Sequence, residues 1–332
     1  MTTLGFNDPD RKLVVGVGSA LIDILAHEND EFIEKAGAAK GGMIYVDKEF
    51  IEHTLQQVKS KLAMVPGGSA CNTTVGIAKL GGQSRFVGKC GNGRMGDFFE
   101  NDLKSQNVQP ALFRSDSPTG RVLSIITPDA QRSMLTYLGA SSETQPGEIT
   151  DRFFNNAAIV HIEGYLLFNP ELILAVMRSA RACGAKICLD LASYTVVEES
   201  RTLLQSIISD YVDILMANED EALAYTGHRD EARALEQMAD SVEIAILKVG
   251  ERGSYVAQGG KVTAIKARLG KPAIDTTGAG DLWASGFLFG LVNGYPIEKC
   301  GEIGSACGYE VCRVVGASIP EEGWQRIRKL LK

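Results

Sequence analysis

Short runs of β-branched and other apolar residues alternate along the chain with amphipathic stretches. The runs that read as buried strands are residues 13–17, 158–162, 186–190, 212–216 and 244–248. Helical patterns lie between them, for example at residues 170–183 and 219–226. This alternation is typical of βαβ units, in which strands that are buried on both faces form a parallel sheet. The pattern therefore predicts an α/β fold, with a doubly wound, mostly parallel sheet and helices on both of its faces.

Polar residues stand where three of these predicted strands end. Asp190 closes one run, Asn218 closely follows the next, and Lys248 closes a third. Ligands of open α/β sheets bind beyond the carboxyl ends of the strands. We therefore expect these three side chains to line one crevice.

One region breaks this rhythm. Residues 121–127 and 132–137 are apolar runs on either side of Pro128-Asp129-Ala130-Gln131, which predicts a β-hairpin around a Pro-Asp turn. Two further short apolar runs, at 21–25 and 43–46, have no adjacent helical pattern. By themselves these segments are compatible with an antiparallel edge of the main sheet. No internal repeat, low-complexity segment or long linker divides the chain.

Composition and charge narrow the range of partners. Of the 332 residues, 45% are hydrophobic, which is enough for one large α/β domain or two. Lys+Arg 34 against Asp+Glu 41 give a net charge of −7, which argues against nucleic acid or an anionic membrane surface as the partner. No apolar run reaches the roughly 18 residues of a membrane span.

The N-terminal residues and the cysteines bear on the cellular compartment. Residues 1–10 lack the basic and apolar regions of a signal peptide. Seven cysteines without a C-x-x-C spacing are typical of reduced thiols, so we expect a cytoplasmic protein. The four histidines lie far apart and show no zinc-ligand spacing.

The segment Asp275-Thr276-Thr277-Gly278-Ala279-Gly280-Asp281 is the most informative one chemically. An apolar run follows at once, so a helix should begin near the glycines. Small residues leave the backbone N–H groups of such a helix start unshielded, and the helix dipole adds positive potential, which together favour an anion. A carboxylate beside an anion site suggests a base that removes a hydroxyl proton as phosphate arrives. The alternative is a glycine-rich turn in which Asp281 caps the helix.

Other phosphate-binding signatures are missing. Gly16-Val17-Gly18-Ser19-Ala20-Leu21 follows a strand but lacks the third glycine of a dinucleotide fingerprint. The chain contains no G-x-x-x-x-G-K-[ST] and no protein-kinase signature. If this chain transfers phosphate, it must therefore use the anion site at residues 278–281.

Four motifs, in order, resemble those of the ribokinase-like, or PfkB, family of sugar and nucleoside kinases. Residues 275–281 are similar to its C-terminal signature, and residues 66–74 with the following helical pattern are similar to its N-terminal one. Residues 218–221 resemble its N-x-x-E motif, and residues 248–253 its K-x-G-x-x-G. The resemblance implies one ribokinase-like kinase domain over residues 1–332. It also implies a small β lid, formed by inserted segments 20–48 and 118–139, that folds over the substrate.

The resemblance implies roles for particular residues in an ATP-dependent, magnesium-dependent phosphotransferase. Those assigned to catalysis are Asp281, as general base, and the phosphoryl-binding amides of Gly278, Ala279 and Gly280. Those assigned to the acceptor's hydroxyls are Asp23, Gly67, Gly68 and Asn72. Those assigned to ATP are Asn218, Lys248, Gly250 and Gly253. Asn218 and Glu221 would orient Mg²⁺ through water, because this ion dehydrates reluctantly.

Several of these assignments have simpler alternatives. Asn218 with Glu221 three residues later is also a helix capping box. Arg132, in the expected hairpin, is either a solvated turn residue or one that reaches a phosphate when the lid closes. A K⁺ requirement is left open, because some family members bind this ion through carbonyls, which leave no trace in a sequence. The oligomeric state is also open between a monomer and a homodimer formed through the lid.

The acceptor is the main open question. Residues 19–23, 134–140 and 161–167 look most like the adenosine kinase branch of the family, which favours the primary hydroxyl of a nucleoside. Glu163 argues the other way, because ribokinases carry a sugar-binding carboxylate here and adenosine kinases usually a small residue. The alternatives are therefore a ribokinase- or fructokinase-like sugar kinase, or a kinase-fold protein that binds nucleoside without turnover.

Glu163 itself is expected to reach the crevice. It ends a buried run and is followed by Gly164, and a buried carboxylate needs partners. If it faces the acceptor, the exocyclic amino group of adenosine would pair with it, whereas the 6-oxo group of inosine would be repelled. We would then expect adenosine to be preferred to inosine.

Overall fold

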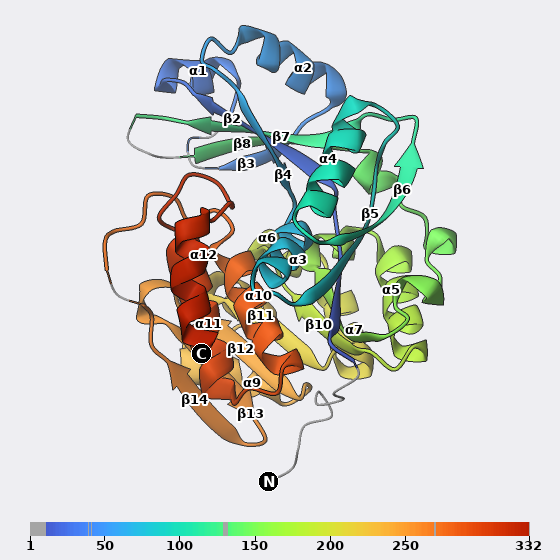
Figure 1. Cartoon of the computed structure of the whole chain (residues 1–332), viewed down its shortest axis with the longest axis vertical. Helices are drawn as coiled ribbons and strands as arrows, with labels where there is room; N and C mark the ends of the chain where they lie inside the picture. The colour runs from blue at the N-terminus through green and yellow to red at the C-terminus, as the bar shows by residue number, and fades with distance from the viewer. Residues whose placement is uncertain (1–10, 39, 41, 129–131, 269, 332) are drawn as a thin grey trace.

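The computed structural model describes residues 11–331 except 39, 41, 129–131 and 269. It contains a large sheet flanked by helices and a second, smaller sheet that lies beyond one end of it (Figure 1). In the described ranges, no helix is long and apolar enough to cross a membrane. The expected α/β class is therefore confirmed, and so is the separate small sheet.

The large sheet has nine strands in the order β14-β13-β12-β11-β10-β9-β1-β5-β6. Its parallel part comprises β1 (Leu13–Val17), β5 (Gln83–Gly91), β6 (Gln109–Ser115), β9 (Ala157–Glu163), β10 (Lys186–Asp190), β11 (Ile214–Asn218) and β12 (Ile244–Lys248). An antiparallel edge is added by β13 (Ser254–Gln258) and β14 (Lys261–Ile265). Every expected core strand is present. Only β11 differs noticeably from its predicted bounds, because it begins and ends two residues later than expected.

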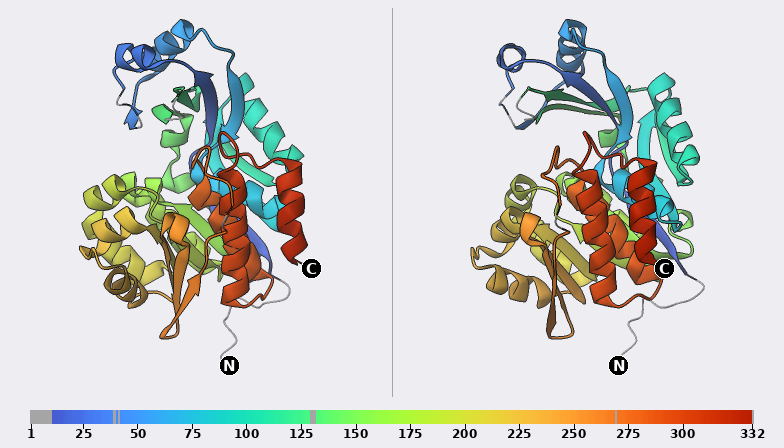
Figure 2. Two further views of the ribbon diagram at one scale, coloured as in Figure 1. Left: turned by 90° about the vertical axis from the view of Figure 1, so that its left-hand side faces the viewer. Right: turned by 60° about the vertical axis from the view of Figure 1, so that its left-hand side comes forward.

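Helices cover both faces of this sheet (Figure 2). On one face lie α3 (Ser69–Lys79), α10 (Ala279–Val292) and α11 (Ile297–Val311), with α12 (Glu321–Arg328) outside them. On the other lie α5 (Pro170–Ala182), α6 (Tyr194–Glu199), α7 (Arg201–Tyr211), α8 (Glu219–Thr226) and α9 (Glu231–Ala239). In β12, Ile244 and Ile246 pack with the α10 face while Ala245 and Leu247 pack with the other. Burial on both faces explains why these strands read as continuous apolar runs.

The second sheet has five strands in the order β3-β8-β7-β2-β4. They are β2 (Leu21–His27), β3 (Met43–Tyr45), β4 (Ala63–Gly67), β7 (Thr119–Ile126) and β8 (Arg132–Gly139). The antiparallel pairing of β7 with β8 confirms the hairpin, whose expected turn lies mostly outside the described residues. The reading as an edge of the main sheet is wrong, and β4 was not expected at all. We call these five strands the small sheet.

Helices also accompany the small sheet, although no helical pattern was expected there. α1 (Asp30–Lys35) and α2 (Lys48–Gln57) follow β2 and β3, and each begins at a capping side chain, Asn29 and Asp47. Buried residues of the small sheet and α2 share a core with α4 (Arg94–Ser105), which joins the small sheet to the body. The remaining short elements are 3₁₀ turns at Ala140–Glu143, Pro146–Glu148, Asp151–Phe153, Gly164–Phe168, Gly250–Arg252 and Lys329–Leu331.

The chain passes between the two sheets at places that matter for the site. Residues 18–20 lead from β1 of the large sheet into β2 of the small one. Gly68 leads back from β4 of the small sheet into α3, which packs on the large one. Both crossings lie beside the carboxyl ends of the central strands, so they border the region where ligands bind in such folds.

Candidate active site

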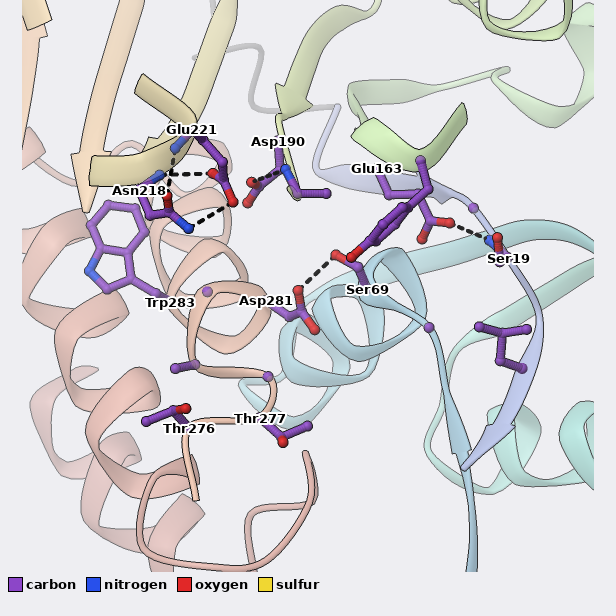
Figure 3. A pocket seen from close by; sticks show the side chains of 18 of the residues that line it. Ser19, Ser69, Glu163, Asp190, Asn218, Glu221, Thr276, Thr277, Asp281 and Trp283 are labelled. Carbon is purple, nitrogen blue, oxygen red and sulfur yellow. Dashed lines mark hydrogen bonds between the residues drawn. The ribbon is translucent and has the colours of Figure 1, made fainter. Parts of the chain in front are cut away.

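A cavity of about 1500 Å³ lies between the carboxyl ends of the parallel strands and the small sheet. Its walls include residues after β9, β10, β11 and β12, the loop before α10, and side chains from β2, β3 and β8. Asp190, Asn218 and Lys248 all line it, as the strand ends predicted. Figure 3 shows Asp281 between the Thr276–Thr277 loop and Ser69, with Asn218, Glu221 and Asp190 on one side and Glu163 on the other.

The loop before α10 forms a helix N-terminus that opens on this cavity. Gly278 is the N-cap in a left-handed conformation, with φ of 72°, and α10 begins at Ala279. The Ala279 N–H donates to the Thr276 carbonyl at 3.1 Å, so this amide is already bonded and differs from the expectation of a free donor. Within the described chain, the amides of Gly278 and Gly280 have no backbone acceptor. These two N–H groups, at the positive end of a helix, remain suited to bind an anion.

Asp281 lies in the first turn of α10, where α3 holds it from the opposite side. The Ser69 hydroxyl donates to its Oδ1 at 2.7 Å, and Asn72 Nδ2 donates to its Oδ2 at 2.9 Å. Burial raises the pKa of the Asp281 carboxyl above its ordinary value, although both hydrogen bonds oppose this. A buried carboxylate with a raised pKa in a fixed orientation has the properties of a general base.

Only some of the residues expected to bind the acceptor line the cavity. Asp23 and Gly68 line the cavity, whereas Gly67 and Asn72 are not among the residues that line it. Gly67 instead makes room for Asp23, because a Cβ at Gly67 would lie 2.7 Å from the Asp23 Cγ. Asn72 donates to Asp281 Oδ2, and its contact with the acceptor stays a prediction.

Arg132 joins the small sheet to the loop before α10, and it is not a solvated turn residue. Its guanidinium lies 3.9 Å from Asp23 Oδ2 and 3.8 Å from Asp275 Oδ2, and its side chain is only 10% exposed. It also donates to the hydroxyls of Thr277 and Ser124. A charge in this position lowers the pKa of Asp23, yet burial dominates and raises that pKa to about 6.

The raised pKa of Asp23 leads to a prediction about acceptor binding. We expect Asp23→Ala to raise the acceptor KM by roughly 10- to 100-fold, since it removes hydrogen bonds worth ~1–3 kcal/mol, with little change in the ATP KM. In the native enzyme the acceptor KM should rise as the pH falls below about 6, because the carboxylate becomes protonated. Asp23→Asn should abolish this pH dependence. A change confined to the ATP KM would indicate that Asp23 binds ATP and not the acceptor.

Glu163, at the end of β9, reaches the cavity wall but is only 1% exposed. Its Oε1 accepts the Ser19 N–H at 2.7 Å, and its Oε2 accepts the Ala70 N–H at 3.1 Å. Burial raises the pKa of Glu163 to about 7, against the effect of both bonds. Both carboxylate oxygens are therefore already bonded to backbone, and no pattern in the sequence predicted these partners.

Asn218 and Glu221 form the capping box at the start of α8. The Asn218 side chain accepts from the Glu221 N–H at 2.9 Å, and Glu221 accepts from both the N–H and the side-chain amide of Asn218, each at 2.8 Å. Glu221 is nevertheless buried against the cavity, and burial raises its pKa to about 7. The capping role is thus realised, and a metal role requires that Glu221 accept a further ligand.

Lys248, at the end of β12, places its ammonium group at the wall of the cavity. Its Nζ lies 2.8 Å from Asp190 Oδ2, and nearby Glu221 also favours its charged form. A Cβ at Gly280 would be 3.2 Å from the same Nζ, so the ammonium borders the anion site. Gly250 lines the cavity with φ of 55° and open space beside it, and Gly253 has φ of 104° where a Cβ would strike the Ile265 carbonyl.

The donor set fits a magnesium ion that is held mainly through water. Asp190 and Glu221 are buried carboxylates facing the same cavity, and the nearby ammonium of Lys248 offsets part of their charge. Across the described ranges, no three acidic, histidine or cysteine side chains converge as a closed metal site. The pair of carboxylates at the cavity fits Mg²⁺, which usually keeps several waters and takes one or two carboxylates together with substrate phosphates.

The sequence reasoning missed three contributors to the site. Ser69 lies within the motif at residues 66–74 and was assigned no role, although its hydroxyl donates to Asp281. Thr277 and Asp275 meet Arg132, and Asp275 also accepts the Gly316 N–H at 2.8 Å, which ties this loop to the segment after α11. Only the hydroxyl of Ser69 within a glycine-rich motif was a usable signal. The K⁺ requirement, which the resemblance leaves open, stays untested.

Comparison with known proteins agrees with this geometry. An adenosine kinase from Sinorhizobium meliloti superposes with a TM-score of 0.88 at 32% identity, covering 96% of this chain and 99% of that one. A 5-dehydro-2-deoxygluconokinase from Geobacillus thermodenitrificans is 27% identical over 72% of this chain and 76% of its own length. A guanosine-inosine kinase from Escherichia coli K12 is 27% identical over 76% of this chain, which spans 61% of that relative. The model of the pfkB family carbohydrate kinases matches residues 30–323, and the chain therefore belongs to this family of kinases.

Proposed function

We propose that this kinase transfers the γ-phosphate of ATP to the primary hydroxyl of a purine nucleoside, with adenosine the first candidate. The observation that carries the proposal is an aromatic pair at the cavity. Tyr45 from β3 and Phe168 from the turn after β9 meet edge to face, with ring centroids 6.4 Å apart. Both line the cavity and both remain about half exposed, at 47% and 46%. Exposed aromatic faces in a binding cavity suit a planar base.

The charges at the acceptor end support a neutral acceptor. Of the cations among the described lining residues, Arg268, Lys271 and Arg313 lie on segments next to α11, and Lys248 pairs with Asp190. Arg132 alone stands near Asp23, and it already faces two carboxylates. An acceptor with its own phosphate or carboxylate would meet Asp23 and Asp281, and no further cation among the described lining residues of this end offsets the repulsion. A nucleoside brings no charge to this end.

The reaction then follows from the positions of these groups. Asp23 accepts hydrogen bonds from the ribose hydroxyls and orients the acceptor. The acceptor oxygen forms a bond to the γ-phosphorus as the bond to the bridging oxygen breaks, which releases ADP. Asp281 accepts the hydroxyl proton late in this step, because little negative charge is needed on the nucleophile in a loose transition state.

The developing charge on the transferring group needs fixed donors. The Gly278 and Gly280 amides and the Lys248 ammonium border the same space, and such preorganised donors stabilise a phosphoryl group without reorganisation. Asp190 and Glu221 would hold Mg²⁺ through water, and the ion would supply charge neutralisation on the ATP phosphates. Arg132 brings a charge from the small sheet to the loop before α10, which favours the small sheet's role as a lid.

The experiment is an acceptor panel. We expect kcat/KM for purine nucleosides to exceed those for ribose and fructose by a wide margin. Adenosine is the first candidate among them because of the likeness to the Sinorhizobium meliloti adenosine kinase, and not because of Glu163, whose oxygens are bonded to backbone. Tyr45→Ala should lower the nucleoside value by about 10-fold or more, since stacking on an aromatic ring is worth ~1–3 kcal/mol per base, and should leave sugar turnover unchanged. Phe98→Ala, an exposed aromatic on α4 and 39% accessible, is the matched control.

The panel also tests the alternatives directly. A clear preference for a free sugar would replace the nucleoside proposal with the sugar kinase one, which the 5-dehydro-2-deoxygluconokinase relative keeps in view. A preference for guanosine or inosine would keep the nucleoside class and change the base. Binding of nucleoside without any product from ATP would contradict catalysis itself.

A further inference from the structure

We propose that Glu163 is a positioning residue: its carboxylate clamps the two chain crossings that join the large and small sheets, and through them it sets the distance between the acceptor site and the catalytic base. This role differs from direct contact with substrate. The structural argument concerns the site of any acceptor, and only its kinetic test uses the proposed function.

The first half of the clamp is the crossing from β1 to β2. Ser19 donates its N–H to Glu163 Oε1 at 2.7 Å. Gly18 leaves the space that the carboxylate occupies, because a Cβ there would lie 2.1 Å from Glu163 Oε2. Four residues after Ser19, the chain places Asp23 in β2. The bond to Ser19 therefore fixes the start of the strand that carries the acceptor carboxylate.

The second half is the crossing from β4 to α3. Gly68 is the N-cap of α3 and offers no side-chain cap, so the first turn of this helix needs acceptors from elsewhere. Glu163 Oε2 accepts the Ala70 N–H at 3.1 Å, and the negative carboxylate suits this positive helix end. The bond holds the turn in which Ser69 contacts Asp281, and Asn72 follows within the same helix.

The two chain crossings contact each other, so the one carboxylate of Glu163 holds both of them. A Cβ at Gly68 would lie 2.2 Å from the Ser19 carbonyl, and Gly68 holds φ of 105°. One buried side chain on rigid β9 thus fixes both crossings against the large sheet. Burial of the carboxylate and the nearby charge of Asp281 raise the pKa of Glu163 to about 7, so its ionised form depends on the two N–H donors.

The decisive test is amide hydrogen exchange of the protein without ligands, in Glu163→Gln and Glu163→Ala. We expect exchange at Ser19 and Ala70 to become at least about 10-fold faster in the alanine variant, because local opening no longer breaks these bonds. The glutamine variant, which keeps one acceptor oxygen and opposes an NH₂ to the other N–H, should fall between the alanine variant and wild type. This variant carries the test if the alanine variant fails to fold.

Asp213→Asn is the matched control. Asp213 is also a buried carboxylate, 5% exposed, that accepts a backbone N–H from Ile187 at 2.7 Å, but it lies before β11, at the opposite end of the strands. Its substitution should leave exchange at Ser19 and Ala70 unchanged. Equal acceleration in this control would show general loosening and overturn the proposal.

Kinetics separate positioning from substrate contact. Misplacement of the base should lower kcat by about 10-fold or more for every acceptor that is turned over, sugar or nucleoside, with a smaller change in acceptor KM. If exchange at both amides is unchanged and only the acceptor KM rises, Glu163 binds substrate and the clamp is wrong. Because the exchange test needs no acceptor, it stands even if the nucleoside assignment fails.

Discussion

Replacing Asp281 by asparagine is expected to lower kcat by ~10²–10⁴ with little change in either KM, because the variant loses the proton acceptor and keeps the shape. The contacts sharpen this expectation. Ser69 can still donate to the amide oxygen of the new side chain, whereas Asn72 Nδ2 would face a second donor or force a flip. The Thr73 hydroxyl bonds the Asp281 backbone carbonyl at 3.1 Å and is unaffected.

The pH dependence follows from the raised pKa of Asp281. The base must be ionised, so kcat of the native enzyme should fall as the pH drops through this raised pKa. The residual activity of Asp281→Asn should lack that fall. A folded-state pKa above the unfolded one means that ionisation costs stability as the pH rises through it. In Asp281→Asn the loss of this buried charge and the lost Asn72 hydrogen bond act in opposite directions on stability. The melting temperature of the variant at neutral pH is therefore measured beside its activity, so that unfolding can be excluded as the cause of lost turnover.

Near-normal turnover in Asp281→Asn would remove the proposed base. Asn72→Ala provides a graded comparison, because it deletes one of the two donors that orient the carboxylate and leaves the carboxylate itself. We expect a fall in kcat smaller than that of Asp281→Asn. A rise in acceptor KM alone would restore Asn72 to the acceptor-binding role that its motif implied.

The second large effect is expected from Gly278→Ala. Gly278 has φ of 72°, and a Cβ there would lie 2.7 Å from the Cβ of Ala317, so the loop must shift. Displacing an amide that faces the transferring phosphoryl group costs about 3 kcal/mol, or roughly 10²-fold in kcat. Gly280→Ala should be milder for stability, because its Cβ would meet only the flexible end of Lys248 at 3.2 Å.

Gly227→Ala is the control that separates backbone strain from site chemistry. Gly227 has a similar φ of 79° at the end of α8, and a Cβ there would meet nothing within 4 Å. Both left-handed glycines should lose about 1 kcal/mol of stability from backbone strain on substitution, and Gly278→Ala should lose more because of its contact with Ala317. Only Gly278→Ala should lose turnover, measured as kcat on folded protein with saturating ATP. Native kcat in that variant would make Gly278 an ordinary turn residue.

Local sequence was sufficient for the elements that have local causes. The apolar runs at β1, β9, β10 and β12 are strands because both faces of each are buried, and an unbroken apolar run is what such burial requires. The start of α10 could also be predicted locally, because glycine favours the left-handed conformation that Gly278 adopts at the N-cap. The strand-end residues Asp190, Asn218 and Lys248 could be placed in one crevice from sheet topology alone.

The sequence predicted only part of the small sheet. The β7–β8 hairpin has a local cause in its turn, but β4 ends in Pro66-Gly67 and its exposure alternates poorly, so no period-2 pattern marked it. It is a strand because Leu21 to Leu25 in β2 pair with it in antiparallel register. Pairing of this kind is decided by a partner, not by the segment itself.

The partners of the polar side chains were decided by tertiary structure alone. Asn72 and Asp281 are 209 residues apart, and Glu163 is 144 residues from Ser19 and 93 from Ala70. The sequence determined that these polar groups exist and that the chain forms a doubly wound kinase fold, and it predicted an anion site beside Asp281. Which donor meets which carboxylate was set by the packing of α3 against α10 and β9, because buried polar groups must be paired and only the folded core brings their partners within hydrogen-bond distance.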